Sequence, residues 1–172
     1  FLESAPPPDS VRFIGVQEMK VTADKAEDYR HRLSRLGWDI HIIPCRGSGN
    51  SASAGVALAG RIGWSIRPLH LCDVGFDVPT SPHFGFWLSD GIFAQGFVVV
   101  VLYLVDSSGL DHTNLALLHS VASVLFTLRK PYVILADWNL TPETLVDSGW
   151  LATIGGSVSA PGRPTCLSRG IG

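Results

Sequence analysis

The sequence predicts an α/β fold, specifically an α/β sandwich with mixed β-sheets flanked by helices. Two apolar runs, Phe97–Val105 and Tyr132–Ala136, are typical of strands buried on both faces. Between them, residues 112–128 carry apolar side chains at helical spacing. The stretch from Gly60 to Gly96 holds several short apolar pieces and no clear helical pattern. Because βαβ units are few, mixed sheets are favoured over a doubly wound parallel sheet.

The first half of the chain predicts three strands and one helix. The apolar run Val11–Gln17 is rich in β-forming residues and predicts the first strand. Thr22 is expected to cap a helix that begins near Asp24 and ends at Gly37. The apolar residues at helical spacing in this segment are Ala26, Tyr29, Leu33 and Leu36. The two further strands expected are Trp38–Ile43 and Ala54–Ala59.

The second half predicts two central strands joined by a long helix. The run Phe97–Val105 is too short to span a bilayer as a helix, which needs roughly 20 residues, so it predicts a strand. The helix His112–Leu128 follows, and Tyr132–Ala136 is the second buried strand. One face of that helix is expected to carry Leu115, Leu118, Ala122, Leu125 and Leu128. Thr141 and Pro142 open a short helix, and Leu151–Ala160 predicts a weak strand.

Composition bounds the class of protein. A length of 172 residues predicts one domain, with residues 1–10 as a linker and residues 11–172 as the domain. Only 16% of residues are charged and 46% are hydrophobic, which excludes a disordered chain. The net charge of −2 gives no general attraction to nucleic acid or acidic lipid. No segment predicts a membrane span, although the mean hydropathy of +0.26 is high.

The cysteines and the chain ends give two further expectations. Three widely spaced cysteines without a C-x-x-C pair argue against structural zinc and mildly favour an intracellular, reducing compartment. The chain begins at Phe1, shows no signal peptide, and stops after Gly172. We therefore expect a fragment truncated at both ends. The sheet edges that such a truncation exposes would favour self-association.

Two acidic residues follow buried strands. Glu18 ends the first predicted strand, and Asp137 ends the strand Tyr132–Ala136. Carboxylates at the carboxyl ends of strands lie at the edge of a sheet where α/β enzymes bind ligands. Their hard oxygen atoms suit Mg²⁺, which takes one or two carboxylates and keeps waters. The alternative is that each acid merely caps a turn.

Five short strings, in the same order along the chain, resemble those of the endonuclease/exonuclease/phosphatase superfamily. The most specific is ILADWNLTP at residues 134–142, which resembles the superfamily's G-D-x-N-x-x-P signature. The other four are VQEMK (16–20), SAGVAL (53–58), VLYLVD (101–106) and PTCLSRG (164–170). The resemblance covers nearly the whole chain. It implies an α/β sandwich and a metal-dependent phosphoric ester hydrolase, nuclease-like and close to the retroelement branch.

The resemblance also implies a role for each matching residue. Glu18 would bind Mg²⁺, with Mn²⁺ as a substitute, and Gln17 would support that site. Asp137 would orient or activate the attacking water, and Asn139 would hold that water or the phosphate. Tyr103 would direct its hydroxyl at the scissile phosphate. The substrate would be nucleic acid or another phosphoester, and DNA, RNA, a phosphoinositide and a small phosphoester all stay open.

The sequence departs from the superfamily pattern at several points. No asparagine precedes Glu18, and the later I-D-Y and S-D-H strings are absent from these 172 residues. Asp106 stands where the pattern has asparagine, and Ala136 where it has glycine. The pair Asp111-His112 precedes a helix and aligns with a different part of the pattern. The expectation is therefore a partial domain with impaired catalysis. The alternative is a non-catalytic remnant or binding module that keeps the fold.

The remaining motifs predict no separate site. The string GSGNSA at residues 47–52 matches a dinucleotide-binding pattern, but a strand pattern follows it where a helix is required. Five histidines share no ligand spacing, so surface or core roles are expected for His31, His41, His70, His83 and His119. The tryptophans are expected in the core.

Overall fold

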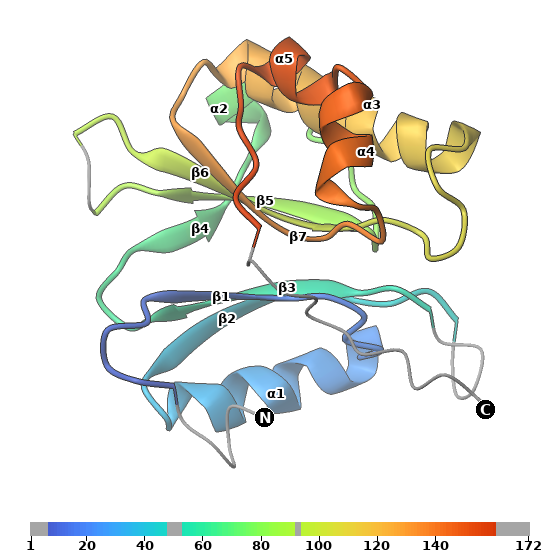
Figure 1. The fold of residues 1–172 in the computed structure, drawn as a ribbon. Helices are drawn as coiled ribbons and strands as arrows, with labels where there is room; N and C mark the ends of the chain where they lie inside the picture. Colours follow the sequence, from blue (N-terminus) through green and yellow to red (C-terminus); the bar gives the residue numbers. More distant parts are fainter. Residues whose placement is uncertain (1–6, 48–52, 92–93, 161–172) are drawn as a thin grey trace. The chain divides into compact units, whose positions relative to one another are not determined.

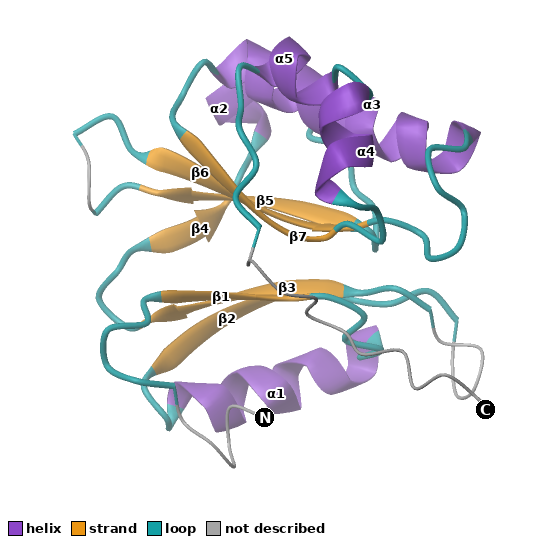
Figure 2. Ribbon diagram, viewed as in Figure 1, coloured by secondary structure: helices purple, strands orange, loops and turns teal. Residues whose placement is uncertain are grey.

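The computed structural model describes residues 7–47, 53–91 and 94–160, and it divides into two compact units, Phe1–Asn139 and Leu140–Gly172 (Figure 1). The first unit is an α/β sandwich of two sheets, each with a helix on its outer side (Figure 2). The expected fold class, mixed sheets flanked by helices, is confirmed. No helix among the described residues is long and apolar enough to cross a membrane.

The first sheet has three antiparallel strands in the order β1-β3-β2. These are β1 (Phe13–Val16), β2 (Trp38–Ile43) and β3 (Val56–Arg61). Alternate side chains of β2, those of Trp38, Ile40 and Ile42, are buried against helix α1 (Ala23–Ser34). Thr22 is the N-cap residue of α1 as expected, but its side chain makes no capping hydrogen bond.

The second sheet has four strands in the order β4-β5-β6-β7. These are β4 (Ile66–Pro68), β5 (Phe84–Ser89), β6 (Phe97–Tyr103) and β7 (Tyr132–Asp137). Strands β4, β5 and β6 are antiparallel, whereas β6 and β7 are parallel. Helix α3 (His112–Leu128) makes the crossover between the two parallel strands, and helix α2 (Leu71–Val74) follows β4. The two long apolar strands are neighbours as predicted. The expectation that the second is central and buried on both faces is wrong, because β7 is the last strand in the described order and none of its residues is buried.

The core of the first unit lies between the two sheets. Val56 and Leu58 of β3 pack with Val99 and Val101 of β6 in one buried cluster. Gly15 lets β1 approach β7, since a Cβ atom there would lie 2.8 Å from the Cβ of Leu135. The carboxyl ends of β1 and β7 can therefore meet at one edge of the sandwich.

The second unit contains α4 (Pro142–Asp147) and α5 (Trp150–Ile154). The short helix predicted at Thr141 is confirmed, and the Thr141 side chain accepts a 3.2 Å hydrogen bond from the backbone N–H of Thr144. The strand predicted over Leu151–Ala160 is wrong, because this segment begins in α5 and forms no strand. The flanking Gly149 and Gly155 take left-handed conformations that begin and end a single helical turn.

Some sequence predictions lie outside the described residues. These are the first six residues of the linker, residues 48–52 of the glycine-rich motif, and the string at residues 164–170. Residues 60–96, which showed no clear pattern, contain β4, α2 and β5. Helix α3 buries Leu118, Ala122 and Leu125 as expected. It leaves Leu115 38% exposed, with Val121 and Val124 buried in addition.

Candidate functional site

Three strand ends place the predicted site residues at one edge of the first unit. Strands β6 and β7 run parallel, and their register aligns Tyr103 with Asp137. The side-chain Nε2 of Gln17, just beyond β1, donates a 2.9 Å hydrogen bond to the backbone oxygen of Leu135 in β7. Because Gln17 precedes Glu18, this bond between the sheets brings Glu18 to the edge that holds Tyr103 and Asp137. The shared edge expected for both acids is therefore observed.

Glu18 and Tyr103 are in direct contact. The Tyr103 hydroxyl donates a 2.9 Å hydrogen bond to Oε1 of Glu18. Burial, then this hydrogen bond, then the negative charges of Glu18, Asp137 and Asp106 raise the pKa of Tyr103 to about 12. The phenol therefore keeps its proton at neutral pH and acts as a donor. The residue is 8% exposed, whereas Glu18 is exposed.

Asp137 lies in a field of like charge. Partial burial of its carboxyl raises the pKa, and the nearby charges of Glu18 and Asp106 raise it further. A hydrogen bond from the backbone N–H of Asn139 acts in the opposite direction. The residue as a whole is exposed, so solvent access limits each of these effects. A cation at this edge would relieve the repulsion among the three carboxylates.

The backbone at this edge is strained. Glu18 and Lys20 have φ angles of 50°, in the left-handed region that disfavours most residues other than glycine. Asn139 has a φ angle of 47°, which asparagine adopts more readily. The side-chain Nδ2 of Asn139 donates a 2.7 Å hydrogen bond to the backbone oxygen of Leu104, which holds the turn after β7 against the end of β6. Such conformations persist where the surrounding structure fixes them, and they concentrate at functional sites.

His83 belongs to this edge, and sequence reasoning missed it. Its ring stacks on that of Tyr103, with centroids 5.6 Å apart and planes 9° from parallel. The two residues lie 20 positions apart. No sequence signal marked it, because the strand β5 that His83 precedes was not predicted. The sequence predicts a surface or core role for His83, and the structure places it, half-buried, against a predicted site residue.

The acids of the turn after β6 have local partners. Oδ1 of Asp106 accepts a 2.7 Å hydrogen bond from the backbone N–H of Ser107. Oδ1 of Asp111 accepts a 2.9 Å hydrogen bond from the backbone N–H of Asn114, which makes Asp111 the N-cap of α3. His112 is exposed in the first turn of that helix. The pair Asp111-His112 thus begins a helix, as the sequence indicated.

The donor atoms at this edge fit Mg²⁺ better than a transition metal. The residues that the structure describes contain no group of three His, Cys, Asp or Glu side chains placed to hold a metal ion. Glu18, with Asp137 and Asp106 near enough to influence one another, offers hard oxygen atoms in small number. Mg²⁺ is commonly held by one or two carboxylates, with water and substrate phosphate completing its shell.

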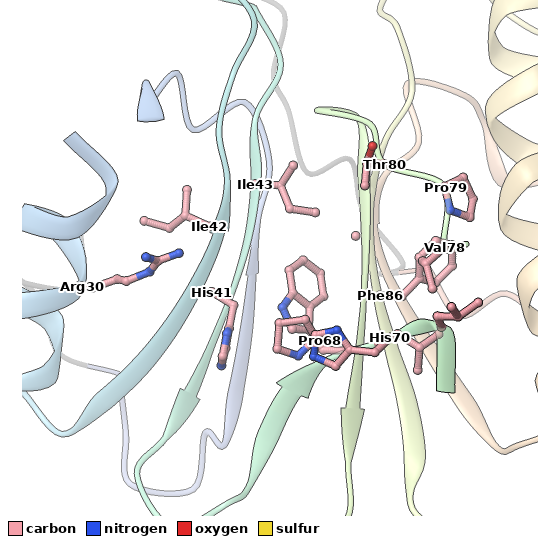
Figure 3. Close-up of a pocket in the computed structure, with 14 residues that line it drawn as sticks. Arg30, His41, Ile42, Ile43, Pro68, His70, Val78, Pro79, Thr80 and Phe86 are labelled. Atoms are coloured by element: carbon pink, nitrogen blue, oxygen red, sulfur yellow. The ribbon is translucent and has the colours of Figure 1, made fainter. Parts of the chain in front are cut away.

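A separate hollow of about 370 Å³ lies between β2 and the pair β4–β5 (Figure 3). Its lining includes Ile43, Phe86 and Trp87, with His41 and Arg30 toward one side. None of Glu18, Tyr103, Asp137 and Asn139 lines it, and its fourteen lining residues include no Asp or Glu. It has histidines, His41 and His70, but no carboxylate to hold a hard metal ion, whereas the strand ends offer several carboxylates.

No family model matches the chain, and no curated protein matches it in sequence. Among solved structures the chain is similar to ANGEL2, a 2',3'-cyclic phosphatase, with 18% identity and a TM-score of 0.55. It is also similar to ANGEL2 in complex with adenosine-2',3'-vanadate, with 17% identity and a TM-score of 0.53. Each match covers 90% of this chain but only 50% and 51% of the ANGEL2 chain, so this chain spans about half of that protein. At this identity the likeness shows a shared fold, in agreement with the α/β sandwich that the sequence predicts.

Proposed function

We propose that the chain is a phosphoric ester hydrolase of the endonuclease/exonuclease/phosphatase superfamily that uses Mg²⁺, or Mn²⁺ in its place, to cleave phosphodiesters of nucleic-acid type. The observation that carries the proposal is the hydrogen bond between Tyr103 and Glu18. It joins two predicted site residues from different sheets at the edge that also holds Asp137 and Asn139. The likeness of fold to a 2',3'-cyclic phosphatase supports the same class of chemistry.

Glu18 is the residue proposed to hold the metal. Its carboxylate is exposed, and its left-handed backbone directs the chain sharply away after β1. The bound ion would supply positive charge to the phosphate oxygens as the transition state gains charge. Gln17 would support the metal site indirectly, because its hydrogen bond to Leu135 fixes the end of β1 next to Glu18.

Asp137 is the residue proposed to activate water. In hydrolysis the water oxygen forms a bond to phosphorus while the bond to the leaving oxygen breaks, and the Asp137 carboxylate accepts the proton that the water loses. The raised pKa suits this role, because a more basic carboxylate is a better proton acceptor. The hydrogen bond to Leu104 uses one of the two amide N–H groups of Asn139, so the second N–H could donate to phosphate and Oδ1 could accept from water.

Tyr103 has one proton to donate. That proton now binds Glu18, so a contact with a phosphate oxygen would replace the present bond. The substrate and the Glu18 carboxylate would thus compete for the same phenol. In this proposal, arrival of the phosphate frees Oε1 of Glu18 for the metal.

The proposal is tested by incubating the purified chain with plasmid DNA, single-stranded DNA and an RNA that ends in a 2',3'-cyclic phosphate, with Mg²⁺ or Mn²⁺. We expect turnover of at least one substrate, abolished in Asp137→Ala and retained in Asp28→Ala, which removes an exposed carboxylate on α1. Turnover that survives Asp137→Ala would place the chemistry elsewhere. No turnover by a folded chain on any substrate would favour a binding module that keeps the fold.

A further inference from the structure

We infer that His83 is a positioning residue of this site: its ring holds the Tyr103 ring so that the hydroxyl meets Glu18. The effect on hydrolysis rests on the proposed function, whereas the effect on the contact between Tyr103 and Glu18 does not. No sequence motif points to His83, and the inference comes from its contacts.

The backbones of the two residues are joined. Strands β5 and β6 pair from Ser89 with Phe97 to Phe84 with Leu102. One step beyond this ladder, the backbone N–H of Tyr103 donates a 2.7 Å hydrogen bond to the backbone oxygen of His83. The sheet therefore fixes the positions of both Cα atoms. The orientation of each ring depends on its side-chain contacts.

The side-chain contacts hold the His83 ring on the Tyr103 ring. The planes are 9° from parallel and the centroids lie 5.6 Å apart, an offset stack. The Nδ1 atom of His83 lies 3.3 Å from the backbone oxygen of Tyr103, a distance at which an Nδ1–H donates to that carbonyl. Two contacts, one with the ring and one with the backbone of the same residue, leave the imidazole little freedom to turn away.

His83 is itself anchored on its other side. Its backbone N–H donates a 3.1 Å hydrogen bond to the Ser81 hydroxyl, and Ser81 forms an isolated bridge with Phe84. The His83 side chain is half-buried, and that burial lowers its pKa, so the ring is neutral at neutral pH. A neutral, anchored ring is a suitable surface on which an aromatic side chain can be held.

The Tyr103 hydroxyl needs such a support. Its partner Glu18 is exposed and has a long side chain, and a single hydrogen bond to an exposed carboxylate constrains a hydroxyl weakly. The phenol must nevertheless stay aimed at one point to serve a reacting phosphate, because small misplacements at a catalytic site are costly. The stack with His83 restricts the orientation of the Tyr103 ring, in addition to the hydrogen bond to Glu18.

The test labels the three tyrosines with ¹³C at the phenol carbon and reads their NMR signals, with Tyr103→Phe used to assign the Tyr103 signal. When His83 is present, the substitution Glu18→Gln should shift the Tyr103 signal, because the group that accepts the hydrogen bond from the Tyr103 hydroxyl changes. We expect the shift caused by Glu18→Gln to be less than half as large in a chain that also carries His83→Asn. Asparagine keeps a donor near the position of Nδ1 but removes the ring. His83→Phe, which keeps a ring, should retain most of it.

The signals of Tyr29 and Tyr132 serve as the folding control, and they should not move in either variant. If His83→Asn unfolds the chain, His83→Leu takes its place, since leucine has no ring to stack. A full Glu18→Gln shift in the variant without a ring would overturn the inference. So would an equal loss in His83→Phe and His83→Asn, which would mark a general structural role.

Where turnover is measurable, His83→Asn should lower kcat about tenfold with KM changed less than twofold, and His83→Phe should recover most of the loss. An unchanged kcat in His83→Asn would also contradict the inference. If neither the wild-type chain nor any variant shows turnover, the proposed function fails. The NMR comparison would still decide whether His83 positions Tyr103.

Discussion

Tyr103 and Glu18 are 85 residues apart in sequence, and a 2.9 Å hydrogen bond joins them. Glu18 follows β1 of the three-stranded sheet, and Tyr103 ends β6 of the four-stranded sheet. The bond therefore spans the two layers of the sandwich at the edge where Asp137 also lies. Because the phenol stays protonated, a neutral hydroxyl donates to a carboxylate in this pair. A substitution can therefore remove the donor or the acceptor independently.

Replacing Tyr103 with phenylalanine should separate the hydroxyl from the ring. We expect kcat to fall about tenfold or more, because the donor aimed at the phosphate is lost while the stack with His83 stays. The free energy of unfolding should fall by only about 1 kcal/mol, since the Glu18 carboxylate left behind is exposed to water. Urea unfolding and steady-state kinetics measure both quantities. A loss of several kcal/mol would mean that the hydroxyl supports the fold.

Magnesium binding should be weak and should depend on Glu18. Few carboxylates face this edge, and no three-ligand group exists among the described residues, so we expect a Kd on the order of 1 mM. Calorimetric titration of Mg²⁺ should give a measurable affinity that Glu18→Gln removes. The matched control is Glu27→Gln, which changes an exposed glutamate on α1. Tight binding that survives Glu18→Gln would place the ion elsewhere.

Asp137→Asn should abolish turnover and yet stabilise the fold at neutral pH. The folded chain raises the pKa of Asp137, so folding favours its protonated form. Below the ordinary value of 3.8 the carboxyl is neutral in both states and has no effect. As the pH rises above 3.8 toward the folded pKa, ionisation costs stability that the asparagine variant does not lose.

The measurement is the free energy of unfolding in urea for both chains at pH 3 and pH 7. The advantage of Asp137→Asn should be present at pH 7 and nearly absent at pH 3. A wild-type chain that is the more stable one at pH 7 would show that a favourable contact of Asp137 outweighs its burial and its like-charged neighbours.

Asp106→Asn should shift the pH dependence of turnover. Its charge contributes to the raised pKa of Asp137, so removing it should lower that pKa and move the acidic limb of the kcat/KM profile to lower pH. The asparagine amide can keep the oxygen that accepts the hydrogen bond from Ser107. KM for a phosphodiester should also fall, since one negative charge leaves the site. An unchanged profile would mean that the charge of Asp106 is screened.

The elements that were predicted well are those with a strong local signal. Helix α3 spans His112–Leu128 as expected, because its apolar residues recur at helical spacing. The run in β6 is buried over almost its whole length, as expected, whereas the equally apolar run in β7 forms the last strand of its sheet and has no buried residue. The site residues Glu18, Tyr103, Asp137 and Asn139 came from short strings and from their positions at strand ends.

The rest depended on contacts that no local pattern carries. Strand β4 has three residues, ends at Pro68, and exists through pairing with β5. The segment at Leu151 predicts a strand from its composition, but two left-handed glycines enclose one helical turn there. The role of His83 depends on a ring 20 residues away in the neighbouring strand, and β5 itself was not predicted.

Arg67 and Asp73 form an ion pair that lies outside the candidate site. Arg67 in β4 donates two hydrogen bonds of 2.8 and 2.7 Å to the Asp73 carboxylate in α2. The backbone N–H of His70 donates a third, also of 2.8 Å. The bonds from Arg67 first, and that from His70 further, lower the pKa of Asp73 from 3.8 to about 2.

A lowered pKa in the folded chain means stability that is present above pH 3.8 and is lost as the pH falls toward 2. The full shift would correspond to roughly 2 kcal/mol, but Arg67 is 40% exposed, so screening by solvent reduces the expected effect to about 1 kcal/mol. Asp73→Asn should therefore be less stable than wild type by about that amount in urea at pH 7, with the difference nearly intact at pH 4 and more than halved at pH 2.5. Asp77→Asn, at an exposed aspartate nearby in the chain, should show no such loss. A deficit in Asp73→Asn that stays constant from pH 7 to pH 2.5 would mean that packing of the α2 turn, and not the ion pair, sets its stability.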